Sequence, residues 1–439
     1  MNTGADSAPP GDDLDEWIHA QYHHCARQML RAISATDIIK PRPGFGQSIQ
    51  AQVGSVVASP VLAAYDPDPD YFFHWYRDSA VVMDALRVLY EDGTLGDEAL
   101  ELFAQFVHFS LGLDALDGRT LVENRQWRAR VQPDFVRFLR DDAELSQLHG
   151  ERIRGETRVN ADGTLDISSW PRPQHDGIAT RALTLRRWLA LPALDPAVRE
   201  AASRLLGADQ QYTRRHWPEP SFDIWEEEFG LHYYTLCTAA AALAGDAACA
   251  AIHRLLDGFW DSHDGYYHSR VLHDGAATTK QLDIAVILAV VHADLPGLRH
   301  SPEDPRVHAT LAHLEALFAG EYPINEHRPA GAGPAMGRYA GDAYYSGGAY
   351  YFSTLGAAQL CYLAAGRLGG TAAQAWMRRG DAFIATVRAY TPESGDLSEQ
   401  FDGRTGIQTS ARHLTWSYAA FISAAAARRA LPGGKVTNS

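Results

Sequence analysis

The sequence has few cysteines and no long apolar run. Its 439 residues include four cysteines, Cys25, Cys237, Cys249 and Cys361, which are scattered and show no metal-type pairing. All four lie in helix-like stretches, where a buried free thiol is the expected state, so we expect no disulfide. No apolar run approaches the length of a membrane-spanning helix. These absences argue against a disulfide-stapled scaffold and against a membrane-embedded protein.

Positive charge is also in short supply. Lys and Arg number 39 against 54 Asp and Glu, which gives a formal net charge of −15. Nucleic acids and anionic membranes both reward clustered basic residues, so neither is expected as a partner, whereas a neutral sugar is compatible. The first residues, MNTGADSAPPGDDLDEW, lack a basic stretch followed by an apolar one, so the sequence predicts a cytoplasmic location.

β-rich sequence is scarce, and helical periodicity dominates instead. Apolar residues recur at three- and four-residue spacing, as in Ile252, Leu255, Leu256 and Phe259. This spacing predicts roughly twelve helices, at about 14–34, 77–92, 96–115, 176–191, 196–215, 229–244, 246–260, 280–293, 305–319, 347–367, 371–389 and 409–430.

The loops between these helices alternate in length. Short links such as 93–96 and 191–196 alternate with long loops that carry Trp, Arg, Asp, Glu and Gly. Long loops are uncommon in compact domains and are usually functional. The pattern predicts an all-α fold, an (α/α)6 barrel of about six helical hairpins with its active-site mouth on the long-loop side. We expect one barrel domain over 14–430, between a flexible polar tail at 1–13 and a C-terminal tail at 431–439.

Four long-loop segments combine flat aromatic rings with charged hydrogen-bonding groups. They are residues 71–78, 170–177, 223–228, and 398–402 continuing to 410–416. A sugar has an apolar face that stacks on aromatic rings and a rim of hydroxyls that Arg and Asp can bind. The four segments therefore predict a carbohydrate pocket.

Glycoside hydrolysis needs two carboxyl groups, one to donate a proton and one to attack or to activate water. Glu226, next to Trp225, and Glu399 are the candidates. A Glu triplet is more often a solvated surface, and the spacing alone does not say which of 226–228 is the acid. The joint occurrence of Glu226 and Glu399 on one side of the same predicted barrel favours the interpretation that they are the catalytic pair.

These segments resemble the glucoamylases of glycoside hydrolase family 15, from about residue 50 to residue 430. Five blocks carry the resemblance in order, namely Gly54–Pro60 with Pro69–Asp78, Gly155–Glu156 with Trp170–Gly177, Asp223–Glu227, Gly337–Tyr345, and Glu399–Asp402 with Ser410–Tyr418. The resemblance implies an (α/α)6 barrel and an inverting exo-acting hydrolase that releases β-glucose from α-glucans, with no metal and no cofactor. It also implies carboxyl groups on the order of 6.5–9.5 Å apart.

The resemblance implies residue roles as well. Glu226 would be the general acid, Glu227 would bind substrate beside it, and Glu399 would be the general base, with Tyr71 orienting the water it activates. The other expected substrate-binding residues are Trp75, Arg77, Asp78, Trp170, Arg172, Arg338 and Trp416.

Three positions depart from the fungal members of the family. Phe73 stands where they have Tyr, Tyr350 stands where they have Trp on the loop facing the outer sugars, and Pro171 replaces a Gly. With no starch-binding module and no secretion signal in view, we expect a short α-linked glucose oligosaccharide, malto- or isomalto-type, rather than polymeric starch. Oligomeric state and linkage preference are left open.

Three other functions stay open on the sequence. Some relatives of the family cleave trehalose. Disaccharide phosphorylases also use α/α barrels, with phosphate in place of water and no need of a second catalytic carboxylate. A non-catalytic sugar-binding protein could keep the same fold, although it would not need both Glu226 and Glu399.

Overall fold

The structure is a computed structural model that describes residues 10–63 and 68–431. Helix α1 (Pro10–Leu30) includes residues 10–13, which were expected in the N-terminal tail. The rest of that tail and residues 432–439 lie outside the described residues.

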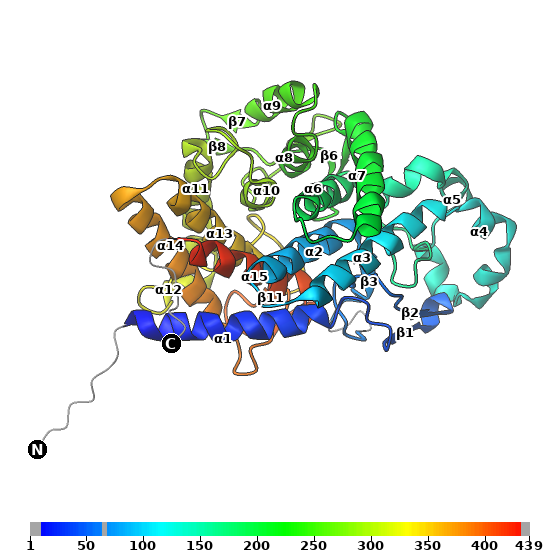
Figure 1. Ribbon diagram of the computed structural model, residues 1–439, viewed down its shortest axis with the longest axis horizontal. Coiled ribbons are helices and arrows are strands. Elements are labelled where there is room, and N and C mark those ends of the chain that lie inside the picture. Colours follow the sequence, from blue (N-terminus) through cyan, green and yellow to red (C-terminus); the bar gives the residue numbers. More distant parts are fainter. Residues whose placement is uncertain (1–9, 64–67, 432–439) are drawn as a thin grey trace, which may run out of the picture.

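Six helices form a closed inner ring (Figure 1). They are α2 (Tyr76–Glu91), α6 (Asp176–Leu189), α8 (Tyr233–Ala242), α10 (Ala285–Ala293), α13 (Tyr351–Arg367) and α15 (Thr415–Arg429). Each packs against the next in the chain, and α15 packs against α2, which closes the ring. Helices α8 and α10 are apolar nearly all round because they have neighbours on all sides, and every residue of α8 is buried.

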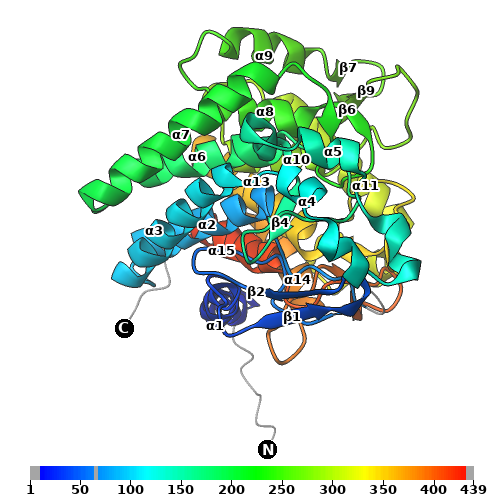
Figure 2. The ribbon, with the colours of Figure 1, turned by 90° about the vertical axis from the view of Figure 1, so that its right-hand side faces the viewer.

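Six further helices form the outer layer, each packed against an inner one. They are α1 against α15, α3 (Asp97–Gly112) against α2, α7 (Pro196–His216) against α6, α9 (Cys249–Asp257) against α8, α11 (Pro305–Glu321) against α10, and α14 (Gly370–Ala389) against α13. Figure 2 shows α3 and α7 on one flank of the ring, with α1 below it. This architecture confirms the (α/α)6 barrel, and all twelve predicted helices are present.

Four predicted helices begin four or more residues too early, because α8, α10, α13 and α15 start at Tyr233, Ala285, Tyr351 and Thr415 rather than at 229, 280, 347 and 409. Residues 229–232 form strand β6 (Phe229–His232), which pairs with β5 (Ser221–Phe222) and β9 (Arg270–Leu272). Helix α15 begins at Thr415, because residues 408–409 pair as strand β12 with β11 (Gln400–Phe401). These strands have two to four residues and are stabilised by pairing with other segments, so helical periodicity does not reveal them.

Smaller elements fill the long loops. The segment 113–160 includes α4 (Arg119–Glu123) and α5 (Asp142–Gln147) and extends beyond the barrel at the right of Figure 1. The remaining elements are α12 (Pro323–Glu326) and strands β1 (Ile39–Arg42), β2 (Gln47–Gln50), β3 (Phe73–Trp75), β4 (Arg158–Asn160), β7 (Trp260–Asp261), β8 (Tyr266–Tyr267), β10 (Ala349–Tyr350) and β12 (Gln408–Thr409).

Short strands lead directly into three inner helices, β3 into α2, β6 into α8 and β10 into α13. The starts of α2 and α6 approach each other so closely that a Cβ on Gly177 would lie 2.7 Å from Cβ of Tyr76 and 3.0 Å from the nitrogen of Arg77. The fold thereby brings the loop segments that precede the inner helices to one end of the barrel.

All four cysteines are free, as expected, and three of them are buried. Across the described ranges, none of the helices combines the length and the apolarity needed to cross a bilayer.

Candidate active site

One pocket of about 260 Å³ lies where the inner helices begin. The long loops and the first residues of α2, α13 and α15 line it. It contains every substrate-binding and catalytic residue expected from the sequence except Arg172. Its lining residues are Ala58, Tyr71, Trp75, Arg77, Asp78, Trp170, Pro171, Ile224, Trp225, Glu226, Glu227, Arg338, Tyr344, Phe352, Glu399, Leu414 and Trp416.

Both carboxyl oxygens of Glu226 accept a hydrogen bond from an indole. Trp75 Nε1 donates to Oε1 at 2.7 Å, and Trp170 Nε1 donates to Oε2 at 2.5 Å. The Arg77 guanidinium lies 3.6 Å from Oε1. The backbone of Glu226 has φ +64°, a left-handed conformation that is unfavourable for a residue with a side chain and that clusters at functional sites. The carboxyl group is thus held in one orientation.

Glu399 has a different set of partners. It is 8% exposed, and hydroxyl groups of Ser410 and Tyr71 donate to its two oxygens, that of Tyr71 at 3.4 Å. Burial raises the pKa of Glu399 to about 7, and the hydrogen bond from Ser410 and the charge of Arg338 partly oppose that rise. A carboxylate with this pKa can take up a proton near neutral pH.

One extended segment orients both carboxyl groups. Tyr71 contacts Glu399 and Trp75 contacts Glu226, and the two rings pack edge to face with centroids 5.3 Å apart. The Tyr71 hydroxyl is also 2.6 Å from that of Tyr344. Residues 71–75 therefore couple the positions of Glu226 and Glu399.

Arg77 and Asp78 begin helix α2 and form a charged end to the pocket. Arg77 lies 3.2 Å from a carboxyl oxygen of Asp78 and 3.2 Å from one of Asp176. Burial raises the pKa of Asp78 to about 6, against the opposing charge of Arg77. Arg77 also lies over the ring of Trp416, 5.5 Å from its centroid, and the buried indole N–H of Trp416 has no partner among residues 10–63 and 68–431. This end offers polar atoms for a ligand beside an aromatic surface.

Arg338 and Glu227 form a second charged group. Arg338 binds Asp342 through two 2.6 Å hydrogen bonds and reaches Glu227 Oε1 at 3.0 Å. Lys280 lies 2.6 Å from Glu227 Oε2, and the Tyr339 hydroxyl donates to the same oxygen. Two cations, Arg338 and Lys280, therefore pair directly with the carboxylate of Glu227, whereas Glu226 has the more distant Arg77 beside it.

Two sequence expectations do not match the positions found. Arg172 does not line this pocket, because its guanidinium is buried in ion pairs with Glu156 at 2.8 Å and Asp166 at 3.1 Å. Tyr350 does not lie on a loop facing outer sugars. It is fully buried in β10, where its hydroxyl donates to Asp342 at 3.0 Å and so supports the Arg338 pair.

Several site residues were not selected from the sequence. Ser410 contacts Glu399, Tyr344 contacts Tyr71, and Asp283 accepts a hydrogen bond from Trp225 Nε1 at 2.8 Å. Ser410 and Tyr344 lie within the family-like blocks that contain Glu399 and Arg338. Their nearness in sequence to those two residues could therefore have identified them as site residues. Asp283 stands alone in sequence and carries no such signal.

Comparisons with known proteins agree with this geometry. Residues 45–426 match the family described as Glycosyl hydrolases family 15. The chain is similar to Glucoamylase 1 of Rhizopus oryzae, with 26% identity over 97% of this chain and 73% of that protein. It is similar to a glucoamylase of Neurospora crassa, with 27% identity over 86% of this chain and 64% of that protein. Its structure resembles that of Hormoconis resinae glucoamylase, with TM-score 0.76, 25% identity and coverage of 95% of this chain and 74% of that one.

Proposed function

The chain belongs to glycosyl hydrolase family 15, and from that premise we propose that it is an inverting, exo-acting α-glucoside hydrolase. The observation that supports this proposal most is the presence of two carboxyl groups in one small pocket, each held by its own partners. The chain spans 64–73% of the length of the two glucoamylases compared with it above, so their activity is carried over as a proposal.

The size of the pocket supports an exo action. About 260 Å³ is below the 300–1,000 Å³ range of sites for drug-sized ligands, so the pocket suits one sugar ring rather than a chain laid along a groove. The rings of Trp75 and Trp416 offer surfaces for the apolar face of that sugar, and Arg77 and Asp78 offer hydrogen bonds to its hydroxyls.

Glu226 acts as the general acid in this proposal. It would protonate the glycosidic oxygen as the bond breaks, and the N–H groups of Trp75 and Trp170 would stabilise the carboxylate that remains. The adjacent Glu227 is unsuited to that role, because Arg338, Lys280 and the Tyr339 hydroxyl already occupy its oxygens.

Glu399 acts as the general base and takes a proton from the attacking water. Hydroxyl donors on both oxygens favour its ionised form, and Tyr71 with Tyr344 offers two hydroxyls that can orient the water. Its raised pKa makes Glu399 a stronger base than an ordinary carboxylate. A raised pKa would also suit a general acid, so kinetic measurements on variants are needed to distinguish the two roles.

Variants of the two residues separate the roles. Glu226→Gln and Glu399→Gln should each lower kcat on maltose by about 10²–10⁴-fold. On 2,4-dinitrophenyl α-glucoside, whose leaving group needs no proton, Glu226→Gln should keep most of its activity whereas Glu399→Gln should not. The opposite pattern would reverse the assignment, and near-normal turnover of maltose by either variant would remove that residue from catalysis.

We further propose a short malto- or isomalto-oligosaccharide as the substrate, with water rather than phosphate as the nucleophile. Arg77 and Arg338, the two basic residues that line the pocket, are each paired with carboxylates, Arg77 with Asp78 and Asp176 and Arg338 with Asp342 and Glu227. The positive charge of each is therefore compensated by carboxylates, which disfavours binding of a phosphate anion. Turnover that strictly requires inorganic phosphate would contradict this, and rates on maltose, isomaltose and trehalose would rank the linkages.

A further inference from the structure

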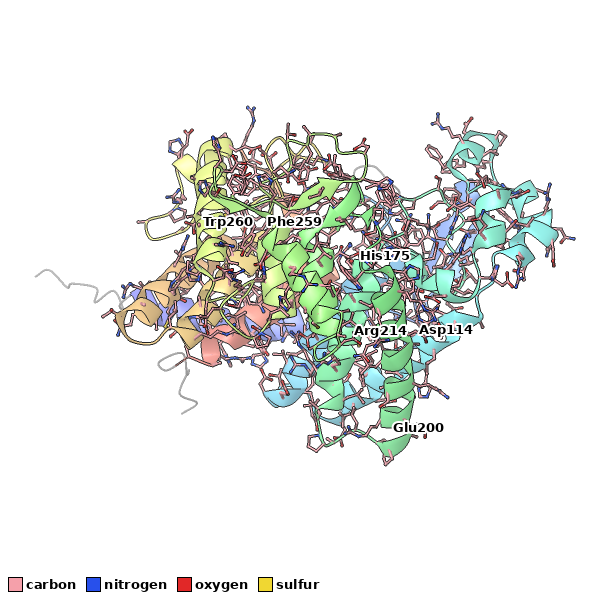
Figure 3. The ribbon with its side chains drawn as sticks, turned by 90° about the horizontal axis from the view of Figure 1, so that it is seen from above. Asp114, His175, Glu200, Arg214, Phe259 and Trp260 are labelled. Carbon is pink, nitrogen blue, oxygen red and sulfur yellow. The ribbon has the colours of Figure 1, made fainter. Side chains whose placement is uncertain are left out.

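A second cluster of polar side chains lies outside the pocket, where the loop before α6 meets the end of α7. His175, His216 and Glu219 each place one possible ligand atom there, and these atoms lie within 4.8 Å of one another. Figure 3 labels His175, and its ring stacks on that of His216 with centroids 5.4 Å apart. The residues are 41 and three positions apart in sequence, so histidine spacing did not reveal the cluster.

His175 has one ring nitrogen without a hydrogen-bond partner among the described residues. The residue is 6% exposed, its Nδ1 is 2.8 Å from the Tyr212 hydroxyl, and its Nε2 is buried without a partner in the part of the chain that the structure describes. Burial, followed by the charge of His216, lowers the pKa of His175 to about 3, so the ring is neutral at ordinary pH. In the tautomer that donates from Nδ1 to Tyr212, Nε2 carries a lone pair. Native structures rarely leave such an atom unsatisfied without a functional reason.

His216 is oriented by carboxylates on both sides. Its Nδ1 is 2.8 Å from Glu219, and its Nε2 is 3.0 Å from Glu151. A histidine that binds metal through one ring nitrogen usually donates its other N–H to a carboxylate or carbonyl, which fixes the ring. Glu151 stands in that supporting position, and Glu219 stands on the ligand side.

We propose that His175, His216 and Glu219 bind one zinc-class divalent transition-metal ion, with Glu151 orienting His216 from behind. Two imidazoles and one carboxylate form a donor set that suits Zn²⁺, whereas Ca²⁺ and Mg²⁺ require oxygen ligands. His216 and Glu219 are partly exposed, so the ion can enter from solvent and water can complete its coordination.

The metal site would stabilise the position of Arg77 in the sugar pocket through the residues next to His175. The amide of Gln174 donates to the carbonyl of Asp223 at 2.6 Å and accepts from Arg77 at 3.2 Å, and Asp176 pairs with Arg77. A metal ion bound to His175 and His216 would link Gln174 and Asp176, the residues on either side of His175, to the end of α7. Occupancy should therefore raise the melting temperature and lower KM while leaving kcat almost unchanged.

The test is titration calorimetry on the full chain after chelator treatment, with ZnCl2 and CaCl2 as separate titrants. Saturable binding of one Zn²⁺ per chain, and none of Ca²⁺, is expected. Because His175 is buried, the variants are made at the solvent side, at His216→Asn and Glu219→Gln, and both should abolish saturable binding. Glu151→Gln should weaken it by about 10–100-fold.

His268→Asn is the matched control. His268 lies 2.8 Å from Asp264 and belongs with Asp261 to another His and Asp group, but that group has no buried unpartnered nitrogen. Its loss should leave Zn²⁺ binding and the zinc-induced rise in melting temperature unchanged. Absence of saturable Zn²⁺ binding, or binding that persists in both His216→Asn and Glu219→Gln, would overturn the proposal.

Discussion

A single buried carboxyl group, that of Glu399, lowers the stability of the folded protein when it is ionised. Its pKa rises from 4.5 to about 7 because the folded site is buried, so the fold favours the protonated form. The stability gained from that proton is present below pH 4.5 and is lost as the pH rises through about 7. An ionised Glu399 is thus a destabilising feature of the folded protein, as expected of the general base proposed above.

Glu399→Gln should therefore stabilise the protein while inactivating it. The gain over the parent chain should be small at pH 4 and should reach about 3 kcal/mol by pH 8. Urea unfolding curves at both pH values measure it. A variant less stable than the parent at pH 8 would contradict the destabilising role of this carboxylate.

Ser410 should tune the same group. Its hydroxyl donates to Glu399 and lowers the pKa of that carboxyl, so Ser410→Ala should raise the pKa further. The acid limb of the kcat/KM profile should move to higher pH, and kcat/KM at neutral pH should fall about 10-fold or more, the usual weight of a hydrogen bond to a charged group. Ser346→Ala is the control, since the Ser346 hydroxyl bonds Gln400 and Thr409. An unchanged profile in Ser410→Ala would show that the contact has no catalytic weight.

For single residues, the sequence predicted which residues lie in the site better than it predicted how they are arranged. Ten of the eleven expected site residues line one pocket, because aromatic and charged residues concentrated in long loops are informative. Arg172 was misplaced because its motif does not show that Glu156 and Asp166 neutralise it. The left-handed backbone of Glu226 and Ser410 was also beyond prediction, since it depends on the surrounding fold.

At the scale of elements, the starts of the inner helices α2, α13 and α15 contribute residues to the pocket. Gly177 near the start of α6 lets that helix approach Tyr76 and Arg77 at the start of α2. Helix interiors were predictable from apolar periodicity. The short strands β6 and β12 were not, because they are too short to show an alternating pattern and depend on pairing with other segments, β6 with β9 and β12 with β11.

Gly177→Ala should push α2 and α6 apart. The added Cβ would overlap Tyr76 and Arg77, so we expect about 1–3 kcal/mol of destabilisation and a raised KM from displacement of Arg77. Gly207→Ala in α7 is the matched control, because Gly207 has open space around its Cβ position and should gain about 0.5–1 kcal/mol. Equal stability of the two variants would show that the contact between α2 and α6 is not tight.

At the scale of the whole molecule, one hydrophobic core runs through the barrel. The main buried cluster includes residues from all six inner helices and from outer helices such as α1 and α11, as in Cys25, Leu86 and Leu314. Smaller apolar clusters lie under the loops, for example around Ile153. A continuous core means that the hairpins cannot lose their packing independently.

Scanning calorimetry should accordingly record one main unfolding transition for the chain. A domain that unfolds separately would need its own core, and the twelve barrel helices share one. Two well-separated transitions of comparable enthalpy would contradict the expectation of a single domain over 14–430.

With Glu226 and Glu399 in the same pocket, we expect water to attack the α-glucoside from the face opposite the leaving group. Proton NMR of the first glucose released from maltose or isomaltose tests it most directly, because the anomers are read before they equilibrate. We expect β-glucose as the initial product. Initial release of α-glucose would contradict it.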